Sequence, residues 1–465
     1  MKISFKIYFT FAFCALTILS CKDDPETSTT DPTDDPTPNN GVPFIIPDGD
    51  EKYITETSEY IFDQSKLHRF DLILPEDHLN EINDDPSAEE YVEGSLVFEG
   101  DTISPVGIRY KGSIGAFVGC LSGSDWATPS GSKTCTKLSM KVKINWGDRD
   151  EKFFDLKKVQ FHSMNNDPSQ MHERLGYHLF RAMGVPAPRA VHAKLYINGE
   201  YNGLFALIEH IDGRFTRHSF DDGKGNLYKE VWPITDKGTL HSDQRYLSSL
   251  KTNEDENPSL ELIKSFSQDM IDASSQAQLH DVLENYLDVN EMLSYAVVDR
   301  MIRHDDGPFH WYCDFGDCES HNFYWYEEPD NQKLHLIAWD LDLAFQSIQD
   351  NSNPVIPIAD DWGETRNNCN PFPFGFFFLM QKSAACDILT GGLADYQLEY
   401  ENLREQFISS SFSQNEIDQL LSTWQTQIQN ATQEAENTHG DAVSVGEWQS
   451  SMDVLKEKID WARNN

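Results

Sequence analysis

The chain has 465 residues, of which 77 are acidic and 37 are basic, so its formal net charge is −40. A surface this acidic repels nucleic acid and anionic lipid, and we therefore expect neither as a direct partner. The charge by itself excludes no class of enzyme, because acidity also keeps an exposed protein soluble.

The N-terminus has the features of an export signal. Lys2 and Lys6 precede an apolar run over residues 7–19, which is too short to form a stable membrane span. The run ends in Ile-Leu-Ser-Cys, which resembles a bacterial lipobox. The sequence therefore predicts that residues 1–20 are a signal peptide and that Cys21 is acylated after cleavage. An ordinary secretory signal with an incidental Cys21 is the alternative.

The residues after Cys21 indicate where the anchored protein would lie. Lys-Asp-Asp at residues 22–24 resembles a signal that directs lipoproteins to the outer face of some Gram-negative outer membranes. Residues 21–50 are mostly Thr, Pro, Asp and Asn, a composition that forms a disordered linker. We therefore expect an extracytoplasmic, surface-exposed outer-membrane lipoprotein that contacts the membrane through its lipid anchor.

The chain contains eight cysteines. Cys14 leaves with the signal peptide and Cys21 carries lipid, so six remain in an exported protein, where disulfides persist. A zinc site is one alternative, but the six lack the Cys-x-x-Cys spacing typical of such a site. Local pairing is the simplest arrangement, and it predicts the disulfides Cys120–Cys135, Cys313–Cys318 and Cys369–Cys386.

Apolar periodicity divides the rest of the chain into two parts. Residues 51–212 predict strands over 70–74, 96–98, 106–111, 137–144, 191–197 and 203–211, with helices over 75–82 and 167–183. Residues 213–465 predict helices over 259–267, 278–286, 289–302, 396–407, 414–434 and 444–462, with one strand pair over 321–326 and 334–339. The expected fold class is α+β, because strands dominate the first part and helices the second.

The second part also holds the densest group of candidate ligands. A predicted helix leads into a loop that contains Asp305 and Asp306, while Asn322 begins one predicted strand and Asp340 ends the next. The strand pair would bring Asn322 and Asp340 close together and near the loop. Carboxylate and amide oxygens suit Mg²⁺, and phosphoryl transfer needs such a metal, a cationic clamp and a residue that orients the nucleophile.

Several short motifs follow one another along the chain: Ile-Arg-Tyr-Lys-Gly at 108–112, Lys-Leu-Ser-Met-Lys at 137–141, Asn-Asp-Pro-Ser at 166–169 with Glu173, Ile-Asn-Gly-Glu-Tyr-Asn-Gly-Leu-Phe at 197–205, Glu209 with Asp212, Asp306 with Gly307, His-Asn-Phe-Tyr at 321–324, and Trp-Asp-Leu-Asp at 339–342. Taken in this order, over roughly residues 65–350, they resemble the spore-coat-protein-H (CotH) family of atypical protein kinases. No single motif is decisive, but their order and spacing together are specific.

The resemblance implies a two-lobed kinase-like fold, with a sheet-rich N-lobe over residues 51–212 and a helical C-lobe over residues 213–465. It implies ATP and Mg²⁺ (or Mn²⁺) as cofactors. Residue by residue, Asp306 matches the catalytic Asp, and Asn322 and Asp340 match the metal ligands. The cofactor-binding residues would be Lys141 as the phosphate clamp with Lys137 as second choice, Glu173 as the partner of that lysine, and Glu209 at the adenine hinge.

These roles have structural alternatives. Asp340 could belong to a strand-end turn or a calcium site, the lysines to a solvated strand face, Glu173 to an exposed helix face and Glu209 to a hairpin anchor. Asp305 leaves open which carboxylate is the base, although a glycine follows the base in the family, as Gly307 follows Asp306. His162, His172 and His192 are expected to be structural. Insertions at residues 118–134 and 312–320 lie beside the expected site.

Two functions follow from these expectations. The first is an ATP- and metal-dependent protein kinase that phosphorylates Ser or Thr of exported proteins. The second is a non-catalytic surface lipoprotein that uses a kinase-like fold to bind calcium, a glycan or a partner protein, which the scarcity of ATP outside the cell favours. Because Asp306, Asn322, Asp340 and candidate clamp lysines are all present, the sequence favours the enzyme.

Overall fold

The computed structural model of the protein describes residues 44–45, 53–54, 57–112, 114–117, 119–125, 128–147, 149–254, 258–314, 317–349, 369–373 and 380–465. The predicted signal peptide, Cys21 and most of the predicted linker lie outside the described residues. In the described part of the chain, no helix is long and apolar enough to cross a membrane.

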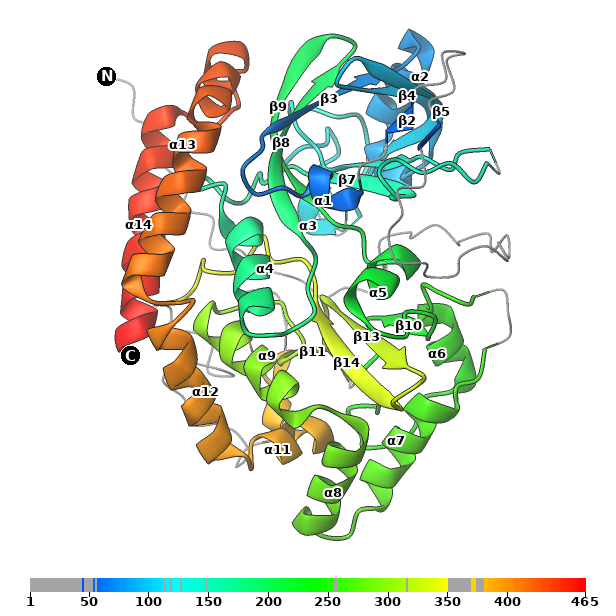
Figure 1. The fold of residues 1–465 in the computed structure, drawn as a ribbon, viewed down its shortest axis with the longest axis vertical. Coiled ribbons are helices and arrows are strands. Elements are labelled where there is room, and N and C mark those ends of the chain that lie inside the picture. Colours follow the sequence, from blue (N-terminus) through cyan, green and yellow to red (C-terminus); the bar gives the residue numbers. More distant parts are fainter. Residues whose placement is uncertain are drawn as a thin grey trace.

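Seven strands of the first half close into a barrel (Figure 1). Their order is β3-β4-β5-β6-β7-β9-β8, and the parallel pairing of β8 with β3 closes the sheet. The other neighbours are antiparallel. The strands are β3 (His68–Ile73), β4 (Val92–Phe98), β5 (Asp101–Tyr110), β6 (Met140–Lys143), β7 (Lys158–His162), β8 (Ala190–Ile197) and β9 (Glu200–Ile208).

Apolar side chains from alternate strand positions fill the barrel. Along β4, buried residues alternate with exposed or half-buried ones, which is the period of two that a strand with one covered face requires. The resulting core contains Phe70, Leu96, Ile108, Phe161 and Phe205, none of them measurably exposed. Short elements accompany the barrel: β1 (Phe44–Ile45), β2 (Tyr53–Ile54), α1 (Ser58–Ile61), α2 (Glu76–Asp84), the 3₁₀ turn Pro86–Ala88 and α3 (Ile114–Phe117).

The strand predicted over residues 137–144 is shorter than expected, since only β6 is regular. Met140 and Val142 point into the barrel core as the alternation predicts. Lys141 is only 1 % exposed, so it does not lie on a solvated strand face. Its register partner is Gln160 on β7, which places Lys141 on the same covered face as His162.

Helix α4 (His172–Ala182) follows β7 and packs with Leu175 and Leu179 in the core that the second half shares. The helix begins later than predicted, and the Asp167 carboxylate accepts a hydrogen bond from the backbone N–H of its first residue, His172 (2.8 Å). The next hairpin confirms its prediction. It turns at Asn198 and Gly199, both with positive φ, as a two-residue Asn-Gly turn requires.

The second half is helical around two small sheets. Its helices are α5 (Gly213–Ser219), α6 (Asp243–Ser249), α7 (Glu261–Asp272), α8 (Gln276–Tyr286), α9 (Val289–Met301), α11 (Ile388–Leu393), α12 (Gln397–Ser409), α13 (Gln414–Thr438) and α14 (Val445–Asn464), with a 3₁₀ turn at Ala384–Cys386. One sheet has the order β10-β13-β14, with β10 (Leu227–Lys229), β13 (Phe323–Glu328) and β14 (Lys333–Ala338). The other has the order β12-β11-β16-β15, with β11 (His310–Asp314), β12 (Asp317–Glu319), β15 (Phe372–Pro373) and β16 (Met380–Ser383).

The six long helices and the β13–β14 strand pair confirm their predictions, whereas the β11–β12–β15–β16 sheet was not predicted. The structure is thus a mixed α+β fold. The three predicted disulfides are also present, Cys120–Cys135, Cys313–Cys318 and Cys369–Cys386. Cys313 and Cys318 are register partners across the β11–β12 pair, so the disulfide ties the two strands of the predicted insertion together.

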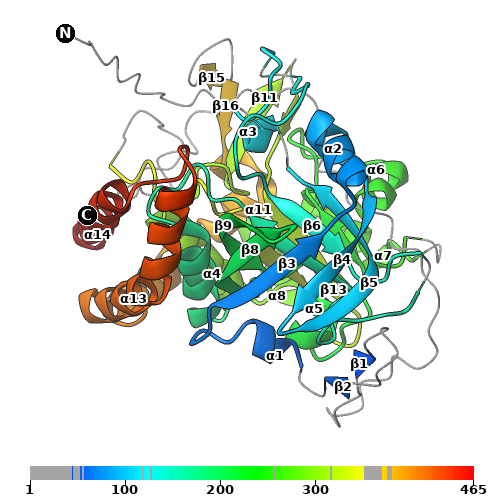
Figure 2. The ribbon, with the colours of Figure 1, turned by 90° about the horizontal axis from the view of Figure 1, so that it is seen from above.

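The last two helices lie side by side along one flank of the molecule and reach the barrel (Figures 1 and 2). On α13, Glu434 accepts a hydrogen bond from Lys194 of β8 (2.6 Å), and the Ala431 carbonyl accepts one from Tyr201 of β9 (3.0 Å). On α14, the Trp448 indole N–H donates to the Ser169 carbonyl ahead of α4 (3.1 Å). These contacts make the C-terminus part of the same folded body as the barrel.

Trp448 tests this arrangement. Its side chain is 0 % exposed and packs in the shared core, so we expect Trp448→Ala to lower the free energy of unfolding by about 3–5 kcal/mol. Val454 on the same helix is 43 % exposed, and Val454→Ala should change that free energy by less than about 0.5 kcal/mol. Urea denaturation measures both. Equal small losses for the two variants would show that α14 is not part of the core.

Candidate functional site

The β13–β14 pair brings two predicted site residues to one end of a hairpin. Phe323 pairs with Ala338, so Asn322 just before β13 and Asp340 just after β14 lie at the same end. Both residues have left-handed backbone, with φ of 60° for Asn322 and 55° for Asp340. Asn and Asp tolerate this conformation better than most residues, and such positions occur preferentially at functional sites.

Asp306 contacts Asn322 directly. The Asn322 side-chain amide donates to the Asp306 carboxylate (2.8 Å) and to the Asp306 backbone carbonyl (3.1 Å). Loss of contact with water is the main cause that raises the pKa of Asp306 to about 6, while His321 and His304 oppose the shift. The loop after α9 therefore places its second aspartate, as predicted, beside the amide at the start of β13.

The neighbouring aspartate has a different environment. The Asp305 carboxylate accepts a hydrogen bond from the guanidinium group of Arg303 (2.7 Å), which is 1 % exposed and has a φ of 52°. Asp305 is thus paired with a residue of its own loop, and it also hydrogen-bonds Ser347 in the segment after β14. The doubled aspartate thus divides into one carboxylate held by Arg303 and one held by Asn322.

His304 links this loop to Asp340, a connection that the sequence did not indicate. One ring nitrogen of His304 is 3.2 Å from the Asp299 carboxylate, and the other is 3.1 Å from the backbone carbonyl of Asp340. Burial alone would lower the pKa of His304, but hydrogen bonding and charge attraction to Asp299 outweigh it, so that pKa is raised. A protonated His304 donates from both nitrogens, which matches its two acceptors.

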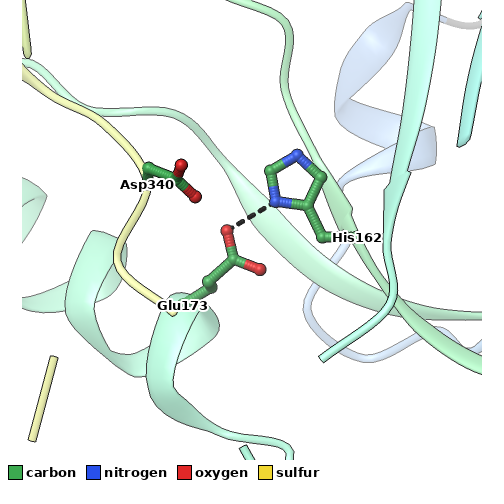
Figure 3. A group of neighbouring side chains, drawn as sticks. All are labelled: His162, Glu173 and Asp340. Atoms are coloured by element: carbon green, nitrogen blue, oxygen red, sulfur yellow. Dashed lines mark hydrogen bonds and ion pairs between the residues drawn. The ribbon is translucent and has the colours of Figure 1, made fainter. Parts of the chain in front are cut away.

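The side chains of His162, Glu173 and Asp340 form a group that could hold a metal ion. Each offers one candidate ligand atom, and the three atoms lie within 4.8 Å of one another. Figure 3 shows their side-chain tips gathered around one space, with Glu173 from α4, His162 from β7 and Asp340 from the segment after β14. His162 was expected to be structural rather than metal-binding, and β7 was not predicted, although Lys158–His162 alternates between polar and apolar residues.

The residues of this group fit a divalent cation. Burial first, and then the charge of Asp340, raise the pKa of Glu173 well above its ordinary value. Burial and the charges of Asp340 and Glu173 likewise raise the pKa of Asp342. One carboxylate oxygen of Glu173, Oε2, is buried without a hydrogen-bond partner. A cation would offset the repulsion and satisfy this oxygen, as hard cations with oxygen ligands do.

Two lysines lie on the same side of the group. Lys111, at the end of β5, has its Nζ atom 2.7 Å from His162 Nε2 and 5.2 Å from the centre of the Trp339 ring. Burial lowers the pKa of His162 well below its ordinary value, and the charges of Lys111 and Lys141 add to this effect. Lys141 is therefore near the site as predicted. Lys111 lies in one of the family-like motifs, but the sequence indicated no role for it.

The other predicted cofactor-binding residues have partners within the barrel. Lys137 donates to the backbone carbonyl of Leu204 on β9 (2.9 Å), and burial lowers its pKa to about 8. Glu209 follows β9, and its carboxylate accepts hydrogen bonds from both the backbone N–H and the side chain of Arg189, which lies just before β8. This contact joins the two open ends of the β8–β9 hairpin to each other, whereas the structural alternative expected Glu209 to fix the hairpin to the second half of the chain.

Glu209 can be tested by separating stability from ligand binding. Its side chain is 3 % exposed and carries the pair with Arg189, so Glu209→Gln should lower the free energy of unfolding by about 2–4 kcal/mol. At a temperature where the variant is folded, its nucleotide affinity should equal that of the wild type. Thermal melts and a nucleotide titration measure the two effects. A large loss of affinity with unchanged stability would return Glu209 to the binding site.

Comparison with known proteins identifies the family to which the chain belongs. The family model described as CotH kinase protein matches residues 108–464, from within β5 to the end of α14. The match begins later than the expected resemblance and extends further, so it includes the C-terminal helices. No curated protein matches the chain. Because the match covers more than half of its length, the chain belongs to the CotH kinase protein family.

Proposed function

We propose that the chain is an ATP- and metal-dependent protein kinase that phosphorylates Ser or Thr of exported proteins. The observation that carries the proposal is the direct contact of Asp306 with Asn322 (2.8 Å) at the hairpin end that also bears Asp340. A base, an amide ligand and an acidic ligand are the parts that phosphoryl transfer requires beside a cationic clamp.

Asp306 would orient the attacking hydroxyl group and accept its proton. Its carboxylate is half-buried and is held by the Asn322 amide, which fixes its direction before a substrate arrives. Asp305 would have a structural role, because its carboxylate is paired with Arg303 inside the loop. These contacts support Asp306 as the base.

Asp340 and Asn322 would hold Mg²⁺ or Mn²⁺, Asp340 through its carboxylate and Asn322 through the side-chain oxygen that lies opposite the amide nitrogen bound to Asp306. The bound metal would neutralise charge on the phosphates of ATP. Lys111 and Lys141 would place positive charge on the same phosphates, since both lie close to His162 beside Asp340.

We also propose that the two halves of the chain act as the two lobes of a kinase. The barrel of residues 68–208 would act as the N-lobe and the helices and sheets after residue 213 as the C-lobe. The nucleotide would bind between them, because Glu173 and the lysines come from barrel-side elements whereas Asp306, Asn322 and Asp340 come from the second half. The helices α13 and α14 would then restrain the two lobes from the outside.

The proposed location is extracytoplasmic. Three disulfides support it, because such bonds persist in oxidising compartments. Because lipobox-like residues precede Cys21, we propose that the chain is a lipoprotein anchored to the outer membrane through this cysteine. Palmitate labelling should therefore be lost in Cys21→Ser. Its substrates would be proteins that share this compartment.

The adjacent aspartates provide a matched test of the base. Asp306→Asn should slow phosphate transfer by about a hundredfold or more, the scale of a general base, while nucleotide binding stays close to wild type. Asp305→Asn should retain transfer within about tenfold, since the Asp305 carboxylate is engaged by Arg303 and Ser347 rather than by Asn322. Radiolabelled transfer to the chain itself and to a generic Ser/Thr protein measures both. The opposite ranking would assign the base to Asp305.

Asp340 tests the metal ligand. Asp340→Ala should abolish transfer and weaken metal-dependent nucleotide binding by about tenfold or more, because it removes a charged ligand. Melting curves verify that the variant is folded. Wild-type binding and transfer in Asp340→Ala would remove Asp340 from the mechanism. If calcium alone raises the melting temperature and Asp340→Ala removes that shift, a calcium-binding function replaces the kinase.

A further inference from the structure

His162 lies between a cation and an anion in the interior of the molecule. Its Nε2 is 2.7 Å from Lys111 Nζ, and its Nδ1 is 2.6 Å from Glu173 Oε1. The three side chains are all at most 8 % exposed, so water does not substitute for either contact. The chain thus joins a buried lysine to a buried glutamate through an imidazole ring.

The two contacts determine which nitrogen of His162 carries the proton. An ammonium group has only N–H donors, so the nitrogen that faces Lys111 must accept, and Nε2 is unprotonated. A neutral imidazole ring carries one proton, so Nδ1 is protonated and its N–H donates to Glu173 Oε1. One neutral tautomer of His162 therefore satisfies both neighbours at once.

This tautomer is incompatible with metal binding by His162. A metal at Nδ1 would replace the proton there, and the neutral ring would then carry its proton on Nε2. That N–H would face the N–H groups of Lys111 at 2.7 Å, which places two donors against each other. Of the three grouped side chains, Glu173 and Asp340 therefore remain as ligands.

We propose that Glu173 and Asp340 share one divalent cation through oxygen atoms alone, and that His162 is a positioning residue that fixes Glu173 without touching the metal. The inference rests on the proposed function for the purpose of the metal, but metal binding itself can be measured without ATP. Two independent features point to the cation: the grouped ligand atoms, and the buried Glu173 Oε2 atom that has no hydrogen-bond partner.

Coordination through oxygen atoms alone limits which metals can bind. Oxygen-only sites suit Mg²⁺, Mn²⁺ and Ca²⁺, whereas an imidazole ligand shifts preference toward Zn²⁺. The hydrogen bond from His162 to Glu173 is of the type that orients a ligand from outside the coordination sphere, and losing such a bond weakens metal affinity by about 10–100-fold. His162 therefore affects how tightly the metal ion binds but is not one of its ligands.

Two substitutions at His162 separate the roles. A glutamine amide offers one donor and one acceptor, so His162→Gln can still bridge Lys111 and Glu173, and its Mn²⁺ dissociation constant should stay within about threefold of wild type. His162→Leu keeps bulk but loses both bonds, and its dissociation constant should rise by about tenfold or more. Titration calorimetry of Mn²⁺ into the nucleotide-free full chain measures each value.

A second histidine–glutamate pair supplies the control. His335 Nδ1 lies 3.0 Å from Glu291 Oε1, between β14 and α9, and neither residue is part of the grouped ligands. His335→Gln and His335→Leu should leave the Mn²⁺ dissociation constant unchanged. Glu173→Gln should raise it by about tenfold or more, and this variant replaces His162→Leu in the comparison if that one does not fold.

Several results would overturn the inference. Equal Mn²⁺ affinities for His162→Gln and His162→Leu, whether both high or both low, would contradict the positioning role. So would wild-type Mn²⁺ affinity in Glu173→Gln, or Zn²⁺ affinity that falls about a hundredfold in both His162 variants. If the wild type binds Mn²⁺ in the expected pattern but transfers no phosphate, the proposed function fails while this inference stands.

Discussion

Three neighbouring carboxyl groups, the buried one of Glu173 and the half-buried ones of Asp340 and Asp342, dominate the charge of the site. Burial and the charges of neighbouring carboxylates raise the pKa values of Glu173 and Asp342. Such a group is unfavourable without compensation. Lys111 counters it through His162, and His304 donates toward the backbone of Asp340. A divalent cation would balance the remaining negative charge, and the ligand atoms of Glu173 and Asp340 lie close enough together to hold one. The other features of the site follow from this need for positive charge.

The same constraint explains why both halves of the fold are needed. Glu173 and Lys111 belong to α4 and the end of β5, whereas Asp340 follows β14 in the second half. The group forms only when the barrel docks on the helical part, and the contacts of α13 and α14 with β8, β9 and the start of α4 hold that docking. Burial of Trp448 and pairing of Lys194 therefore support a site that neither residue touches.

Sequence patterns predicted what depends on local periodicity or turn chemistry. The long helices, the Asn198–Gly199 turn and the β13–β14 pair with Asn322 and Asp340 at its ends were predicted, as were the three local disulfides. Barrel closure was not, because parallel pairing of β3 with β8 joins distant segments. The strand β7 was not predicted, although Lys158–His162 alternates between polar and apolar residues. The expectation that His162 is structural agrees with its contacts to Lys111 and Glu173. Lys141 was expected near the site, but strand alternation alone did not predict that its side chain is only 1 % exposed.

We propose that this acidic group, the Asp306–Asn322 contact and the neighbouring lysines together bind a nucleotide with a divalent metal ion. The most direct measurement is a calorimetric titration of the wild-type full chain with a non-hydrolysable ATP analogue, in Mg²⁺, in Mn²⁺, in Ca²⁺ and without divalent metal. We expect the ATP analogue to bind in Mg²⁺ or Mn²⁺, and to bind at least about tenfold more weakly without metal. Absence of binding in both Mg²⁺ and Mn²⁺ would contradict it.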